Sequence, residues 1–191
     1  MYYRPVLYES DIKSWFKNVQ SFLAGLDNAG DTNYLDILND QERCYNTDES
    51  FFLLNPSFGN VVAQRATKNI YKVRGYDKEG ITVIACFSVS GVIVKPQIIY
   101  PYERVPNLVR GSLPPSLHMS YSKSGWMNAK LFYEFIKDVF HPHIVNKQGI
   151  NVPTILYNDR HSSHLSLNVC ELCEQHNIIL VKIYSNSTLN H

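Results

Sequence analysis

The order of the apolar segments is the feature that most limits the fold of this chain. A strand-like pattern over residues 43–54 precedes two β-branched runs at 81–89 and 92–100, and the turn-forming pair Ser90 and Gly91 separates these runs. Two helix–strand pairs follow this hairpin. Antiparallel strands followed by helix-linked strands predict an α/β fold, in which helices flank a mixed sheet.

The second half of the chain alternates between helical and strand-like periodicity. The expected elements are a helix at 125–140, a strand at 154–157, a helix at 165–176 and a strand at 178–184. Pro142 is expected to end the first helix, and Asn177 to cap the second. Pro96 predicts an edge position or a bulge in the second hairpin arm. The proline-rich stretch 101–124 is expected to be a long irregular connection.

The first 40 residues predict a helical segment or linker that precedes the main domain at 41–191. Ser10 is expected to cap a helix over residues 11–26, and a short helical turn is expected at 34–39. The apolar face of the first helix would consist of Ile12, Trp15, Phe16, Val19, Phe22 and Leu23.

Composition favours a folded globular domain over a disordered chain, because 45% of the 191 residues are hydrophobic and 18% are charged. The net charge is only +1, but residues 60–110 carry eight Lys or Arg against three Asp or Glu. This basic stretch is a candidate for phosphate contacts, or else a solvated strand-and-loop face. Its candidate nucleic-acid-binding residues are Arg65, Lys68, Lys72 and Arg74.

Neither a secretory signal nor a membrane span is expected. No apolar stretch follows the first residues, and the apolar run at 81–94 is too short to cross a bilayer. The four cysteines are therefore expected to be reduced. Cys170 and Cys173 have CxxC spacing without a second pair, which favours structural thiols over a zinc site. Cys44 lacks an identifiable partner base for a role as nucleophile.

Two aspartates stand out as candidates for divalent metal binding. Asp48 lies within the first strand pattern, and Asp159 follows the strand at 154–157. Carboxylates at the ends of neighbouring strands can hold the metal ions of phosphoryl-transfer enzymes, provided that both point to the same side. The alternative is that each is a turn former or helix cap. Glu49 should face the opposite side of the strand, which favours a supporting or surface role.

His161 and His164 are spaced to share one face of a helix entry. In that position they could support Asp159 or contact a phosphate. The alternative is a polar helix start with imidazoles that face solvent.

Five short blocks in a fixed order carry a family resemblance. They are RCYNTDES (43–50), ITVIAC (81–86) with its turn and following arm, SGWMN (124–128), LYNDRHSSH (156–164) and SNSTLNH (185–191). Together they resemble the catalytic domain of DDE-superfamily endonucleases of the pogo, Tigger and jerky type, which derive from transposases. The chain departs from the family pattern at Phe51, where the pattern has glycine, and at Arg160, where it has a small residue.

The resemblance implies a ribonuclease H-like fold and metal-dependent cutting and joining of DNA in the nucleus. On that basis Asp48 and Asp159 would hold two magnesium or manganese ions about 3.5–4 Å apart. Glu49, Arg160, His161 and His164 would support the ligands or contact phosphate.

The family's third acidic ligand follows the stretch that residues 185–191 resemble, so a domain truncated at its C-terminus is expected. Cleavage would then be weak or lost. The alternative is a domesticated module that binds DNA or protein without catalysis. Truncation would also expose apolar surface around residues 178–183 and favour self-association.

Overall fold

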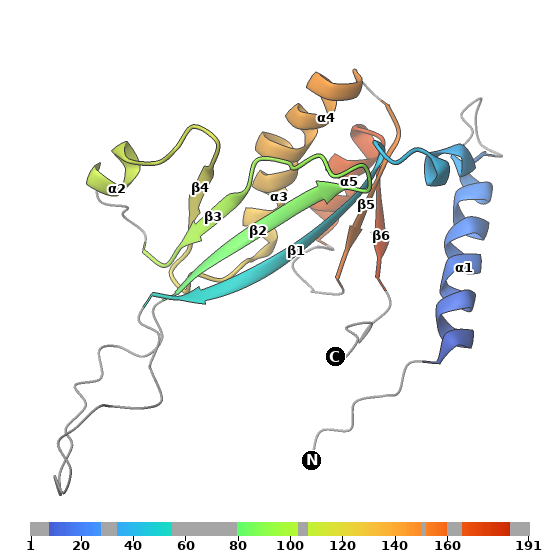
Figure 1. Cartoon of the computed structure of the whole chain (residues 1–191), viewed down its shortest axis with the longest axis horizontal. Coiled ribbons are helices and arrows are strands. Elements are labelled where there is room, and N and C mark those ends of the chain that lie inside the picture. Colours follow the sequence, from blue (N-terminus) through green and yellow to red (C-terminus); the bar gives the residue numbers. More distant parts are fainter. Residues whose placement is uncertain are drawn as a thin grey trace, which may run out of the picture.

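A mixed sheet organises the molecule (Figure 1). The computed structural model describes residues 8–27, 34–54, 80–102, 107–149, 152–159 and 166–183. Within them the strands are β1 (Cys44–Leu53), β2 (Gly80–Ser88), β3 (Gln97–Tyr100), β4 (His118–Tyr121), β5 (Thr154–Asn158) and β6 (Ile178–Lys182). Their order across the sheet is β4-β3-β2-β1-β5-β6. β1, β2 and β3 pair antiparallel, whereas β4, β5 and β6 join by parallel pairing. The α/β expectation is therefore confirmed.

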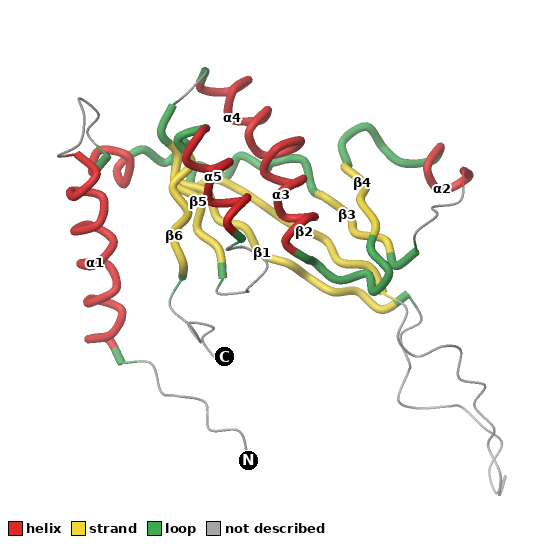
Figure 2. Tube along the Cα trace, turned by 180° about the vertical axis from the view of Figure 1, so that it is seen from behind, coloured by secondary structure: helices red, strands yellow, loops and turns green. Residues whose placement is uncertain are grey.

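One face of the sheet is covered by helices, as the view from behind shows (Figure 2). These are α3 (Ala129–Phe135), the π-helical segment η2 (Ile136–Phe140), α4 (His141–Gln148) and α5 (Leu167–Gln175). Phe132, Phe135 and Phe140 of this layer are almost completely buried, and they pack in one core with strand residues such as Tyr45 and Ile84. We call this side of the sheet the closed face.

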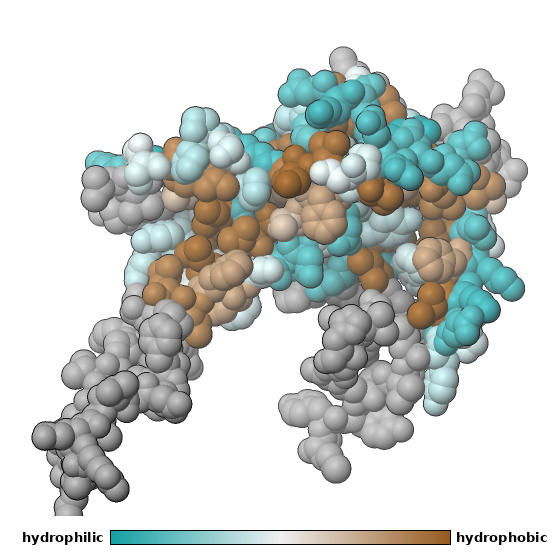
Figure 3. All heavy atoms as spheres, in the orientation of Figure 1, coloured by the Kyte–Doolittle hydropathy of each residue, from teal (hydrophilic) through white to brown (hydrophobic). Residues whose placement is uncertain are grey.

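The opposite side, which we call the open face, is covered mainly at its β5–β6 end. There α1 (Glu9–Asp27) and the 3₁₀ turn η1 (Leu35–Asn39) bury Val19, Leu23 and Ile37 against Cys44, Ile155 and Val181. The Trp15 indole donates to the Lys182 carbonyl at 2.9 Å and so fixes α1 to β6. Towards β2 the open face carries exposed side chains, among them Phe87, and Figure 3 shows apolar residues at this surface.

Only part of the predicted apolar face of α1 is buried. Val19 and Leu23 lie in the core, whereas Phe16 and Phe22 are about half exposed. The expectation of exposed apolar surface around residues 178–183 is likewise wrong for Ile178 and Val181, which are buried beneath α5 and α1 respectively.

The first helix begins earlier than the sequence predicts. Ser10 lies inside α1 and is not its cap. Instead the Asp11 carboxylate accepts a hydrogen bond from the Tyr8 amide at 3.2 Å, which is the backward half of a capping box. An exposed ion pair between Glu9 and Lys13, four residues apart, lies along the first turns.

Pro142 does not end the helix that it was expected to end. α3 starts after Asn128, whose side chain accepts from the Leu131 amide at 3.0 Å, and the helical path continues to Gln148. A proline inside a helix lacks one amide donor and its ring clashes with the carbonyl of the preceding turn. The wider π-helical turn of η2 lies directly before Pro142, and there it accommodates the ring without breaking the helix.

The stretch 101–124 is more regular than expected, because it contains α2 (Asn107–Gly111) and strand β4. β4 is short and half polar, and it forms by parallel pairing with β3, so its own sequence carries little signal. Pro96 lies immediately before β3, which is an interior strand, and the hairpin ladder is interrupted there. Asn177 has the positive φ of 54° expected for a helix C-terminus.

Candidate metal centre

The pairing of β1 with β5 brings the two candidate aspartates together. In this parallel ladder Tyr45 lies opposite Leu156, and Asn46 lies opposite Tyr157. Continuing the same register by two residues places Asp48 beside Asp159, just past the carboxyl end of β5. Ligands collect at this end of strands in open α/β sheets, because the chain leaves the sheet there and frees polar side chains.

Strand alternation also gives both aspartates the same orientation. Cys44 and Ile155 are ladder partners, and both pack in the core beneath α1 on the open face. Side chains repeat every second residue along a strand, so Asp48 and Asp159 fall on the open face as well. Both are exposed. The condition that the two carboxylates point to the same side is therefore met.

Glu49 joins this pair. One carboxylate oxygen from each of Asp48, Glu49 and Asp159 lies within 4.8 Å of the others. Alternation directs Glu49 to the closed face, where it lines a hollow with Phe51 and Trp126, but its longer side chain also reaches the other two carboxylates. In addition, the Glu49 amide donates to the Asp48 carboxylate at 2.9 Å. Sequence alternation alone did not predict that Glu49 would reach the cluster.

The donor set suits a hard divalent cation. Carboxylate oxygens are the ligands that Mg²⁺ and Mn²⁺ prefer, and three of them at mutual distances below 4.8 Å can bind one ion together. Two come from adjacent positions on β1, and the third comes from the residue that follows β5. The paired strands fix the backbone positions from which these side chains project.

A buried polar side chain lies next to the cluster. Asn158 precedes Asp159 and is completely buried, and within the described residues neither its amide nitrogen nor its oxygen has a hydrogen-bond partner. Its backbone carbonyl accepts from the Ile183 amide at 2.8 Å, which holds the end of β5 against β6.

Several predicted site residues lie outside the described residues, and their roles stay predictions. They are Arg160, His161 and His164 beside the second aspartate, and Arg65, Lys68, Lys72 and Arg74 in the basic stretch.

The cysteines do not form a second centre among the described residues. Cys44 is buried, donates to the Ile37 carbonyl at 3.2 Å, and has its pKa raised to about 11, mainly by burial and then by Asp40. A thiol in this state is a poor nucleophile at neutral pH. Cys170 is exposed and Cys173 is buried, and both are free thiols. Burial raises the pKa of Cys173 to about 12.

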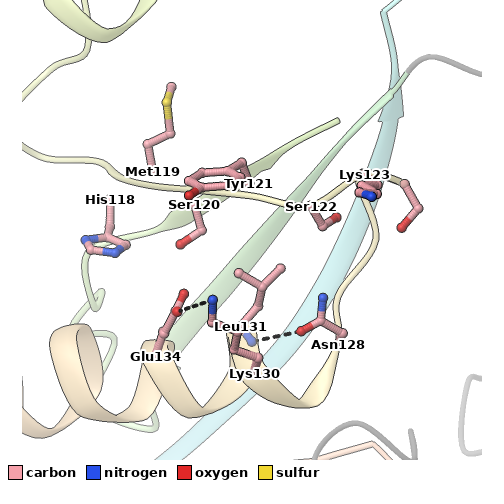
Figure 4. Close-up of a pocket in the computed structure, with 11 residues that line it drawn as sticks. His118, Met119, Ser120, Tyr121, Ser122, Lys123, Asn128, Lys130, Leu131 and Glu134 are labelled. Atoms are coloured by element: carbon pink, nitrogen blue, oxygen red, sulfur yellow. Dashed lines mark hydrogen bonds and ion pairs between the residues drawn. The ribbon is translucent and has the colours of Figure 1, made fainter. Parts of the chain in front are cut away.

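A second hollow, of about 500 Å³, lies at the β4 edge of the sheet (Figure 4). His118 and Ser120 point from β4 towards α3, and Met119 points away. Lys130 and Glu134 form an exposed ion pair at 3.7 Å on the helix side. Burial and the nearby Lys95 lower the pKa of His118. This pocket is polar, and Asp48, Glu49 and Asp159 do not line it.

None of the described helices combines the length and apolar character that crossing a bilayer requires.

Fold, site and sequence together define the class of protein. The family model for the DDE superfamily endonuclease matches residues 78–190, which is more than half of the chain, and the chain belongs to this family. The match includes Asp159 and the strands that hold it, whereas Asp48 and Glu49 precede it. No curated protein matches the chain in sequence.

Solved transposase structures share the fold. The catalytic domain of Mos1 mariner transposase is 12% identical with a TM-score of 0.51, and the match covers 97% of this chain and 67% of that one. The Mos1 transposase paired-end complex with left transposon end is 13% identical with a TM-score of 0.50, over 98% of this chain and 46% of that one. The chain thus spans less than half the length of the transposase in that complex. The ribonuclease H-like fold expected from the sequence is confirmed.

Proposed function

We propose that this chain carries a metal-dependent site for DNA strand cleavage and transfer, of the pogo, Tigger and jerky type. The observation that carries this proposal is the group of three carboxylates from β1 and the end of β5, in a chain of the DDE superfamily endonuclease family. Two relatives of the same fold support it. One is a Mos1 catalytic domain determined with Mg, at 14% identity and a TM-score of 0.50, and the other is the Mos1 complex with a transposon end.

Asp48 and Asp159 would hold the metal, and Glu49 would supply a further oxygen. A bound divalent ion can activate a water molecule or a 3′-hydroxyl and stabilise the leaving oxygen. The protein's own contribution is positioning. β1 and β5 are neighbouring parallel strands, so Asp48 and Asp159 keep their spacing while the substrate binds. Exposure of both aspartates on the open face leaves room for a DNA backbone to approach.

The predicted residues outside the carboxylate cluster would contact the phosphates of the DNA. Arg65, Lys68, Lys72 and Arg74 supply positive charge that suits backbone contacts, and this type of contact makes binding strongly dependent on salt. Arg160, His161 and His164 follow Asp159 directly and would act at the reacting phosphate. DNA as substrate implies a nuclear location, which we propose on the family resemblance.

A strand-cleavage assay tests the proposal. The purified chain is incubated with supercoiled plasmid in Mg²⁺, in Mn²⁺ and in a chelator. We expect weak nicking at most, and only with metal, and we expect Asp48→Asn and Asp159→Asn each to abolish it, because each change removes a ligand charge. Glu171→Gln is the matched control, since this exposed carboxylate on α5 lies outside the cluster and its loss should leave nicking unchanged.

Nicking that persists in the Asp48→Asn, Asp159→Asn double variant would contradict the proposed site. Absence of nicking together with salt-sensitive DNA binding would favour the alternative, a domesticated module that binds DNA without cutting it.

A further inference from the structure

A pair of stacked aromatic rings, one of them exposed, lines the same hollow as Glu49. The rings of Phe51 and Trp126 are 4.4 Å apart between centroids and 7° from parallel. Trp126 nevertheless remains 55% exposed, so Phe51 covers one side of the indole and much of the rest faces solvent. An exposed apolar surface beside polar groups can mark a binding site.

The Phe51 ring packs closely over a glycine that has no side chain to obstruct it. Gly80 begins β2 under the Phe51 ring, and a Cβ at this position would lie 2.2 Å from the Cζ atom of Phe51 and 2.7 Å from the Phe52 carbonyl oxygen. Neither the ring nor the backbone could remain in place at such distances. The Phe51 ring can therefore take this position only because residue 80 is glycine.

The loop that carries Trp126 is fixed as firmly. Gly125 has a φ of +71°, and a Cβ there would approach the Gly80 carbonyl oxygen to 2.7 Å. The Thr82 hydroxyl donates to the Gly125 carbonyl at 2.6 Å. The Trp126 amide donates to the Ser124 hydroxyl at 3.3 Å, and its carbonyl accepts from the Ser122 hydroxyl at 3.0 Å. The backbone of this exposed tryptophan is thus anchored on both sides.

A shared hollow connects the ring pair to the candidate metal centre. The hollow has a volume of about 270 Å³ and is lined by Glu49, Phe51, Thr82, Trp126 and Met127. Glu49 is also one of the three clustered carboxylates. A flat ligand against Trp126 and a phosphate held at the cluster would therefore share Glu49 as a neighbour.

We propose that Trp126, supported by Phe51, stacks on an unpaired base of the DNA strand that lies at Asp48, Glu49 and Asp159. This inference rests on the proposed function and adds the form of the substrate, a strand that is single-stranded or frayed beside the reacting phosphate. A preorganised aromatic surface binds any base through its π-face, so it fixes the position of the strand without reading its sequence.

Fluorescence can follow this contact selectively. The chain has only two tryptophans, Trp15 and Trp126, so Trp15→Phe leaves Trp126 as the single reporter. A single-stranded oligothymidylate is titrated into this variant in the presence of a chelator, where cleavage cannot occur. We expect quenching of Trp126 emission by the single strand, and weaker quenching by a blunt duplex of the same length.

Two substitutions separate stacking from folding. Trp126→Leu should weaken single-strand binding about tenfold, as expected for the loss of one base–aromatic stack, and Trp126→Phe should retain most of the affinity. Binding of these variants is measured by anisotropy of a labelled oligonucleotide, and circular dichroism melting confirms that each is folded. Phe22→Leu on α1 is the matched control, because it removes another half-exposed aromatic ring far along the chain.

The proposal is overturned if Trp126→Leu binds the single strand as tightly as the parent, or if Trp126→Phe loses as much affinity as Trp126→Leu. Equal quenching by the blunt duplex would also overturn it, as would a change in Trp126 emission with protein concentration alone, which would indicate a protein contact. These results are independent of nicking. Nicking that depends on Asp159, without any effect of Trp126 on binding, would support the proposed function and contradict base stacking. Single-strand binding that depends on Trp126, without nicking that depends on Asp159, would support base stacking and contradict the proposed function.

Discussion

The two faces of the sheet differ in how they use similar strands. On the closed face, β1 and β2 direct Tyr45, Ile84 and Cys86 into a continuous core under α3, η2 and α5. On the open face, the same strands present Asp48 and Phe87, which are exposed. The difference teaches that strand alternation separates the core residues of β1 from its exposed aspartate, because a one-residue step along the strand changes the face to which a side chain points. Glu49 is the exception, since it starts on the closed face and still reaches the other two carboxylates.

The largest expected effect is on the closed face. Phe135→Ala should lower the free energy of unfolding by about 3–5 kcal/mol, because it leaves a cavity in a completely buried layer. Phe87→Ala removes a ring that is 46% exposed on the open face and should cost about 1 kcal/mol or less. Urea unfolding of both variants measures the difference. Similar losses of unfolding free energy in the two variants would contradict the difference between the closed and open faces.

The next effect concerns α1, which covers one end of the open face. Leu23→Ala should destabilise by about 2–5 kcal/mol, because Leu23 is completely buried against the β5–β6 end of the sheet. Phe22→Ala, at the neighbouring half-exposed position, should cost about 1 kcal/mol or less. Thermal melting monitored by circular dichroism checks both. A negligible effect of Leu23→Ala would mean that α1 contributes little to the folded domain.

The smallest effect is a pH dependence that comes from the closed-face layer. Burial, and next Lys147, lower the pKa of His143 from its usual 6.5, and the ring makes an edge contact with Tyr45 at 5.9 Å. The folded state thus resists protonation more than the unfolded state does. Stability from this group is complete above about pH 6.5 and is lost as the pH falls through the lower folded pKa.

Urea midpoints at about pH 7.5 and about pH 5.5 measure this loss. His143→Phe keeps a ring against Tyr45 and should shrink the difference between the two midpoints. His118 and His141, whose pKa values are also lowered by burial, contribute to the remainder. An unchanged difference in the variant would contradict the assignment to His143.

Sequence patterns were sufficient wherever an element buries its own apolar residues. β1, β2, β5, α5 and β6 all fall close to their predicted ranges. The patterns failed where pairing or backbone geometry decides the outcome. β4 depends on β3 for its existence, and the helix passes Pro142 because of a π-helical turn that local sequence does not announce.

The candidate site was predictable to a similar degree. The strand patterns indicated Asp48 within the first strand and Asp159 just after a later one, and in the structure their carboxylates lie close together. The reach of Glu49 into the cluster depends on the length of its side chain, which alternation does not encode. The stack of Phe51 on Trp126 depends on close approach at Gly80 and Gly125, residues that are far apart in sequence. Phe51 is also a position at which the chain departs from the family pattern.

The most direct test of the central claim, that the open face holds a divalent metal ion, is a calorimetric titration with Mn²⁺. The parent chain should bind, Asp159→Asn should lose binding, and Glu49→Gln should weaken it, while Glu171→Gln behaves as the parent. All variants should unfold at the same urea concentration as the parent, because the three carboxylates lie outside the core. Equal Mn²⁺ binding by the parent and the Asp48→Asn, Asp159→Asn double variant, or no binding by either, would contradict the account.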